Sequence, residues 1–130
     1  MDKKILAIAD DIFFVAKIKE TARQVSVPLE AICQEVVLRE AIATGTVSGV
    51  ILDLNCNSLD VVKVIRSLKL NPPGKLPPLV GFLRHTQTDL FLQAKEVGLD
   101  RVMPRSELVK ELPQLLLSLA PERSPADAVP

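Results

Sequence analysis

The sequence predicts an α/β fold: a five-stranded, doubly wound parallel sheet with helices on both of its faces. Short apolar segments recur along the 130 residues, which is the pattern of strands buried on both faces. Segments with apolar residues at three-and-four spacing, typical of amphipathic helices, separate them. This alternation favours right-handed crossovers and therefore a parallel sheet. The length fits one domain with a real core, which we expect at residues 1–119.

The N-terminal half is expected to supply three strands and two helices. The strands are the apolar runs 5–9, 28–33 and 50–52, of which the second is the weakest. The helices are 13–25 and 36–43. Four residues would form the inner face of the first helix: Val15, Ile18, Ala22 and Val25. Gly45 would end the second helix in a left-handed conformation.

The next elements continue the alternation. A helix is expected over 59–69, followed by a proline-rich loop over 70–78 and a strand over 79–83. The inner face of that helix would consist of Leu59, Val62, Ile65 and Leu68. Thr86 would cap the following helix, with Asp89 as the acidic residue three positions on, and Gly98 would end it.

The last elements are a short strand over 101–103 and a helix that ends near Leu119. Pro113 lacks a backbone N–H, so we expect a kink or a fresh start of the helix there. A wide stripe of leucines would partly cover the sheet, and its excess would form a dimer or partner face: Leu108, Leu112, Leu115, Leu116 and Leu119. Residues 120–130, rich in proline, are expected to be a disordered tail.

Composition excludes several classes of function. Sixteen basic residues balance sixteen acidic ones, and the chain has no Trp and no Tyr, so direct nucleic-acid binding is not expected. No apolar run approaches the ~20 residues of a membrane span, and no secretory signal is present. Cys33 and Cys56 are too few for a disulfide framework. We therefore expect a cytoplasmic protein with two reduced thiols and no membrane partner.

Three carboxylates follow two apolar strands that would be neighbours in this fold. Asp10 and Asp11 follow the first strand, and Asp53 ends the middle one. In such sheets the chemistry sits beyond the carboxyl ends of the strands. Crowded carboxylates favour a bound cation, and Mg²⁺ prefers oxygen ligands. A plainer interpretation is that acidic residues here simply cap helices, but the pair together with a third carboxylate favours a site.

Several of these segments resemble the receiver domain of two-component response regulators, the CheY-like family. The resemblance covers residues 3–119. Residues 5–11 match the family's first strand and acidic pair, and residues 50–53 match its third strand and phosphoacceptor aspartate. Residues 54–60 follow the family's loop spacing, and residues 96–100 resemble the segment before its fifth strand. The resemblance implies the flavodoxin-like receiver fold.

The resemblance also implies a site and partners. Asp53 would accept a phosphoryl group from a sensor histidine kinase or a phosphotransfer protein. Mg²⁺ would be held by Asp10, Asp11, Asp53 and the backbone carbonyl of Asn55. A downstream partner, or a second copy of the chain, would bind the face formed by the fourth and fifth helices.

Some positions depart from the family's pattern. The family's switch Ser or Thr falls on Leu83, or on Arg84 after a shift of one residue, and neither has a hydroxyl. Arg105 stands in place of the family's lysine, and its planar fork is not equivalent to a lysine. The aromatic switch position falls on Val102. The sequence therefore suggests an atypical or degenerate receiver.

Alternative functions remain open. A pseudo-receiver would act as an adaptor without phosphorylation. A small Mg²⁺-dependent phosphohydrolase with Asp53 as nucleophile is less favoured, because Asn55 stands where a general acid is needed. A nucleotide- or flavin-binding domain would need a glycine-rich phosphate loop, which the chain lacks. We thus expect a signalling domain, not an enzyme.

Three further residue types invite functional interpretations. His85 lies at the rim of the expected crevice, where a surface role is favoured over a ligand role. Cys56 reads as a bland loop thiol. Of Phe13 and Phe14, one would be exposed as a partner contact or would pack in the core or at the rim.

Overall fold

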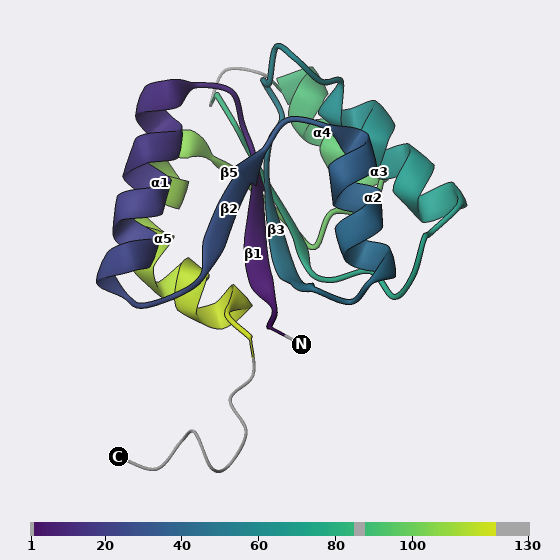
Figure 1. Ribbon diagram of the computed structural model, residues 1–130. Helices are drawn as coiled ribbons and strands as arrows, with labels where there is room; N and C mark the ends of the chain where they lie inside the picture. The colour runs from purple at the N-terminus through teal and green to yellow at the C-terminus, as the bar shows by residue number, and fades with distance from the viewer. Residues whose placement is uncertain (1, 85–87, 122–130) are drawn as a thin grey trace.

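The computed structural model describes residues 2–84 and 88–121 of the chain, and these residues alternate strands with helices (Figure 1). The strands are β1 (Lys4–Ile8), β2 (Leu29–Ile32), β3 (Val47–Asp53), β4 (Leu79–Leu83) and β5 (Arg101–Pro104). The helices are α1 (Ile12–Gln24), α2 (Glu35–Ala43), α3 (Val61–Leu70), α4 (Thr88–Glu96) and α5 (Arg105–Leu119). Every predicted strand and helix is present, most with ends shifted by one or two residues.

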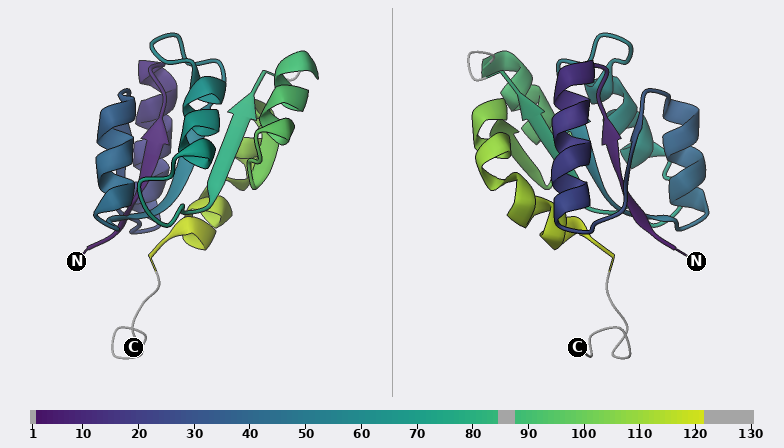
Figure 2. Two further views of the ribbon diagram at one scale, coloured as in Figure 1. Left: turned by 90° about the vertical axis from the view of Figure 1, so that its right-hand side faces the viewer. Right: turned by 60° about the vertical axis from the view of Figure 1, so that its left-hand side comes forward.

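The strands form one parallel sheet in the order β2-β1-β3-β4-β5. Figures 1 and 2 show α1 and α5 on one face and α2, α3 and α4 on the other. The predicted doubly wound α/β fold is confirmed. Because β1 and β3 pair in parallel, with Ile8 opposite Leu52, the residues that follow β1 lie beside the end of β3.

The core has two halves, one on each face of the sheet. Strand residues alternate between them: Leu52 packs in the half beneath α2, α3 and α4, and Ile51 packs in the half beneath α1 and α5. The central strands are therefore buried on both faces, as their continuous apolar runs predicted. β3 is longer than the predicted 50–52, because its first residues, from Val47, extend the pairing with β1 across an irregular step.

The inner face of α1 differs from the prediction. Asp11 caps the helix, which therefore begins at Ile12, and the buried residues are Phe14, Ile18 and Ala22. The prediction placed Val15 on this face instead of Phe14. Both residues fit a helical period with Ile18, and the larger aromatic ring fills the space against β4, where its centroid lies 5.0 Å from that of Phe82.

The starts and ends of the other helices refine the prediction. Asp60 caps α3, so Leu59 precedes the helix and packs only partly against the core. Gly45 has a φ of +71°, which confirms its expected left-handed conformation after α2, and Gly98, predicted to end the next helix, follows α4 with a φ of +89°. The expected cap at Thr86 lies outside the described residues, as does the expected tail beyond residue 121.

The last helix runs through Pro113 without a fresh start, so the kink is the alternative that stays a prediction. The same helix corrects one expectation. The leucine stripe has no excess, since every member is buried: Leu108, Leu112, Leu115, Leu116 and Leu119. The amphipathic face is wide because α5 packs on the sheet and against α1 at once. The exposed leucine of α5 is Leu117, which is 55% exposed.

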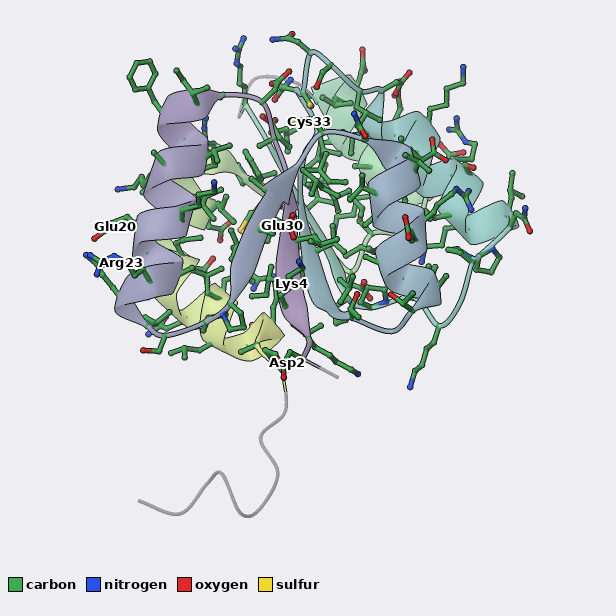
Figure 3. The ribbon with its side chains drawn as sticks, in the orientation of Figure 1. Asp2, Lys4, Glu20, Arg23, Glu30 and Cys33 are labelled. Atoms are coloured by element: carbon green, nitrogen blue, oxygen red, sulfur yellow. The ribbon has the colours of Figure 1, made fainter. Side chains whose placement is uncertain are left out.

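Ion pairs lie on the surface of the sheet and helices, and Figure 3 labels the residues of two of them. Lys4 of β1 pairs with Glu30 of β2, and Glu20 pairs with Arg23 on the exposed side of α1. Exposed pairs of this kind contribute little to stability. In the described part of the chain, no helix combines the length and apolar character needed to cross a membrane.

Adjacent leucines of α5 test the corrected packing. Leu116 is fully buried, whereas Leu117 is largely exposed. We expect Leu116→Ala to lower the free energy of unfolding by about 2–5 kcal/mol, because it leaves a cavity. Leu117→Ala, the matched control with the same change in helix propensity, should stay within about 0.5 kcal/mol. Urea denaturation measures both, and similar costs for the two variants would contradict the packing.

Candidate functional site

A cavity of about 290 Å³ opens at the carboxyl end of the sheet, where the topology places the ends of β1, β3, β4 and β5. Its lining residues are Asp10, Asp11, Asp53, Asn55, Asn57, Phe82, Leu83, Arg84 and Arg105. The structure thus brings together the predicted carboxylates, Asn55 and Arg105, which come from three separate parts of the chain.

Asp53 is the last residue of β3 and lies deep in this cavity. It is 7% exposed and is the one buried charged residue in the described part of the chain. The backbone N–H of Asn55 donates to its Oδ1 at 2.8 Å. Burial raises the pKa of Asp53, and the carboxylates of Asp10 and Asp11 add to this, against the opposing effects of the Asn55 N–H and the Arg105 charge. A negative charge at Asp53 is therefore costly in this environment.

Asp10 holds the loop between β3 and α3. Its Oδ2 accepts hydrogen bonds from the backbone N–H groups of Asn57 at 3.1 Å and Ser58 at 2.9 Å. Partial burial acts to raise the pKa of Asp10, but the hydrogen bonds, first those from Ser58, lower it overall. Asp10 thus ties the loop that follows Asp53 to the end of β1.

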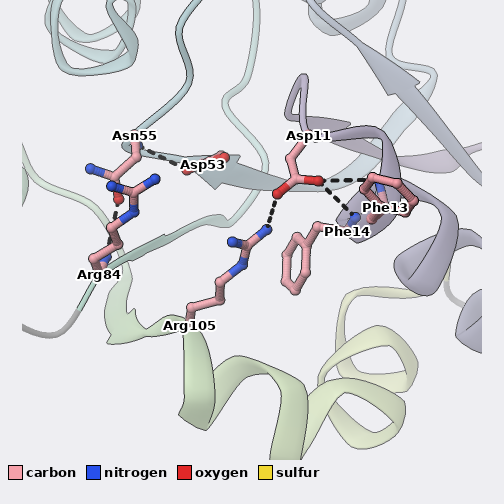
Figure 4. A network of polar contacts seen from close by, with 7 residues as sticks. All are labelled: Asp11, Phe13, Phe14, Asp53, Asn55, Arg84 and Arg105. Carbon is pink, nitrogen blue, oxygen red and sulfur yellow. Dashed lines mark hydrogen bonds and ion pairs between the residues drawn. The ribbon is translucent and has the colours of Figure 1, made fainter.

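Asp11 has two roles, one on each carboxylate oxygen (Figure 4). Its Oδ1 accepts from the backbone N–H groups of Phe13 at 3.1 Å and Phe14 at 3.2 Å, which caps α1. Its Oδ2 accepts from Nη2 of Arg105 at 2.9 Å. The Arg105 hydrogen bond, followed by the cap, lowers the pKa of Asp11. The helix-cap interpretation of this aspartate is therefore confirmed, and Asp11 also lines the cavity beside Asp53, where its role in a site stays a prediction.

Arg105 is the first residue of α5 and reaches across the cavity to Asp11. Its guanidinium carbon lies 3.9 Å from the centre of the Phe14 ring, a cation–π contact. The same Phe14 ring packs against the buried ring of Phe82 in the core. The Nε of Arg105 is buried without a hydrogen-bond partner among the described residues. The sequence pattern indicated Phe14 as a core, rim or partner residue but not its contact with Arg105, for which the only signal was the proximity of Phe14 to the acidic pair.

The other wall of the cavity is formed by the end of β4 and the residue after it. Leu83 is buried and pairs with Pro104 of β5, whereas Arg84 is exposed. The backbone N–H of Arg84 donates to Oδ1 of Asn55 at 3.0 Å, which ties this segment to the loop after Asp53. Both candidate switch positions therefore line the cavity, and neither carries a hydroxyl.

Other predicted candidates lie at the margins. Cys33 is exposed, and its thiol donates to the carbonyl of Ala9. Cys56 is half-buried, with Sγ 3.4 Å from Oγ of Ser58. Phe13 is 83% exposed, so it is the exposed member of the aromatic pair. His85 lies outside the described residues.

The cavity can be tested for its fit to a divalent metal. Three carboxylates line it, and hard cations such as Mg²⁺ take such oxygen ligands. The raised pKa of buried Asp53 also shows an environment that a cation would relieve. Within residues 2–84 and 88–121, however, no three acidic, cysteine or histidine side chains are grouped to hold a metal as they stand. The carboxylate oxygens are therefore the right type of ligand for a divalent metal, but in this structure Oδ2 of Asp11 accepts a hydrogen bond from Arg105.

Solved structures that share this fold include receiver domains of response regulators. The signal receiver domain of a response regulator from Bermanella marisrubri has a TM-score of 0.76 and 23% identity, covering 92% of this chain and 98% of that one. Chemotaxis response regulator CheY4 of Vibrio cholerae has a TM-score of 0.69 and 18% identity, with coverage of 92% and 99%. The chain thus has the receiver-domain fold over nearly its whole length.

A third similar structure carries a metal. The receiver domain of sensor histidine kinase PA1611 from Pseudomonas aeruginosa has magnesium coordinated in its active site cleft. It has a TM-score of 0.74 and 13% identity, covering 92% of this chain and 98% of that one. No protein-family model matches this chain, and no curated protein matches it in sequence. The likeness is therefore one of fold.

The buried charge of Asp53 predicts a pH-dependent gain from its removal. A carboxyl whose pKa is raised on folding favours the folded state at low pH and loses that contribution as pH rises through its folded pKa. Asp53→Asn should therefore be more stable than the wild type at pH 7, and the difference should shrink as pH falls below about 4, where unfolded Asp is protonated.

Urea denaturation at pH 7 and at pH 3.5 measures this difference. Glu40→Gln, at an exposed carboxylate of α2, is the matched control and should show no such gain. A destabilising effect of Asp53→Asn at pH 7 would show that the buried charge is favourable.

Proposed function

We propose that the chain is a receiver domain that accepts a phosphoryl group on Asp53 in two-component or phosphorelay signalling. One observation carries this proposal: Asp53 lies deep in a cavity. The same cavity is lined by Asp10 and Asp11, which follow β1, and by the positively charged Arg105. The donor would be a sensor histidine kinase or a phosphotransfer protein. The fold shared with solved receiver domains supports the same conclusion.

In this proposal each residue has a chemical role. An Asp53 carboxylate oxygen forms the bond to phosphorus as the donor's bond to the phosphoryl group breaks, and the donor's leaving atom keeps the electron pair. The raised pKa of Asp53 leaves its carboxylate more nucleophilic than an exposed one. Arg105 stands close enough to lower that pKa, so its charge also opposes the negative charge that the phosphoryl group brings.

A divalent metal is part of the proposal. Asp10, Asp11, Asp53 and the backbone carbonyl of Asn55 would hold Mg²⁺, which when bound neutralises phosphoryl oxygens during transfer. Support comes from the oxygen ligands that line the cavity and from magnesium in the cleft of the PA1611 receiver domain.

A second candidate is a pseudo-receiver that acts as an adaptor without phosphorylation. It is favoured by the side chains at the end of β4, since Leu83 and Arg84 offer no hydroxyl to a phosphoryl group. A downstream partner or a second copy would bind at α4 and α5, where Leu92 and Leu117 are exposed. A phosphohydrolase is disfavoured, because Asn55 is not a general acid and its amide oxygen already accepts from Arg84.

Intact mass after incubation with Mg²⁺ and a small acyl-phosphate donor tests the proposal. We expect the wild type to gain the mass of one phosphoryl group, because Asp53 faces the cavity. Asp53→Asn should gain none. Asp60→Asn, at the cap of α3 outside the cavity, is the matched control and should behave as the wild type. A folded wild type that gains no mass would favour the adaptor instead.

A further inference from the structure

The pairing of Arg105 with Asp11 affects the place of a metal. Asp11 accepts two backbone N–H groups on Oδ1 and the Arg105 guanidinium on Oδ2, so both of its oxygens are engaged by this chain. A divalent metal ligated by Oδ2 would lie beside the positively charged guanidinium, and the two cations repel each other, so the metal and Arg105 compete for Asp11. The two backbone N–H groups form the cap of α1 and carry no net charge, whereas Arg105 is held to Asp11 by a partly exposed ion pair, so the guanidinium is the donor that yields.

Arg105 is also incompletely satisfied where it lies. Its Nη2 reaches Asp11, but its buried Nε has no partner among the described residues. A buried donor without a partner costs free energy, which weakens the hold of this position on the side chain. The guanidinium is thus held at Asp11 by one ion pair, and the Nε, which is unpaired within the described part of the chain, lowers the free-energy cost of moving it away.

The Phe14 ring connects this pairing to the rest of the molecule. Arg105 stacks on one part of the ring, and Phe82 of β4 packs against it from the core at a centroid distance of 5.0 Å. Phe14 belongs to α1 and Arg105 to α5, two helices in direct contact on the same face of the sheet. A movement of Arg105 therefore changes the environment of Phe14 first.

We propose that Arg105 is an internal cation that holds Asp11 in place of a divalent metal, and that its displacement by the metal is sensed through Phe14 at the contact of α1 and α5. This inference rests on the proposed receiver function and adds how the site is regulated. The residue at the end of β4, Leu83, has no hydroxyl with which to draw that segment toward the site. The response therefore arises on the α1–α5 face and not at α4.

The four phenylalanines of the chain provide the experiment. The protein is produced with 4-fluorophenylalanine, and ¹⁹F NMR follows a titration with MgCl₂ alone. Single Phe→Leu variants assign the four signals. The Phe14 signal reports on the position of Arg105, and the signal of Phe91 on α4 reports on the other face of the sheet. The signal of exposed Phe13 reports on changes in the solution itself, such as its ionic strength. We expect Mg²⁺ to shift the Phe14 signal with saturation and to leave the Phe91 signal in place.

Variants of the arginines separate pairing from net charge. Arg105→Met keeps an apolar stem on Phe14 but removes the cation, so the Phe14 signal should be shifted before Mg²⁺ is added. Its Mg²⁺ affinity should rise about fivefold, which is the upper range for loss of a partly exposed ion pair. Arg84→Met removes a charge from the same cavity without touching the pair with Asp11 and should produce a smaller gain and no Phe14 shift.

Two outcomes would overturn the proposal. One is an equal Mg²⁺ affinity in the wild type and Arg105→Met, including the absence of binding in both. The other is a Phe91 response as large as that of Phe14. Phosphorylation of Asp53 is measured separately by intact mass. If the chain gains the phosphoryl mass but gives either of these two outcomes, the proposed receiver function stands and the proposed displacement of Arg105 is rejected.

Discussion

The pairing of β1 with β3 in parallel is the constraint on which the site depends. It places Asp10 and Asp11, which follow β1, beside Asp53 at the end of β3, so three carboxylates meet at one edge of the sheet. The hydrophobic core holds this register, because the side chains of both strands are buried and alternate between the two halves of the core, where each packs among its own neighbours. The packing that stabilises the fold therefore keeps the three negatively charged carboxylates close together despite their mutual repulsion.

The molecule relieves this crowding by giving each carboxylate different partners. Asp10 takes backbone N–H groups from the loop after β3, and Asp11 takes those of the first turn of α1 and the Arg105 guanidinium. Asp53 is the most buried of the three and has a raised pKa, so its charged form is the one that this environment disfavours. The group that is hardest to keep charged is the one at the centre of the cavity, and a cation or an added group acts on it most strongly.

Much of the fold follows from local sequence patterns. Continuous apolar runs reveal the buried strands, and the order of strands and helices restricts the topology to parallel crossovers. The convergence of Asp10, Asp11 and Asp53 could be predicted because strand ends are determined by that topology. Gly45 and Gly98 could be placed because a helix end needs a left-handed residue there.

Other features depend on contacts that are distant in sequence. Arg105 and Asp11 are 94 residues apart, and nothing local to either indicates that they pair. Phe14 and Val15 fit a helical period equally well, and only the space against Phe82 decides between them. The leucines of α5 suggested an excess of apolar surface because the sequence does not reveal that this helix packs on both the sheet and α1.

The most direct test of this account is a double-mutant cycle between Asp11 and Arg105, measured as the free energy of unfolding in urea. Asp11→Asn keeps the cap of α1 while removing the charge, and Arg105→Met keeps an apolar stem on Phe14. We expect Arg105→Met to destabilise the wild type and to cost clearly less in the Asp11→Asn background, because its partner is already neutral. Equal costs in both backgrounds would show that the two side chains do not stabilise one another, and the compensation of charge at the strand ends would have to come from another group.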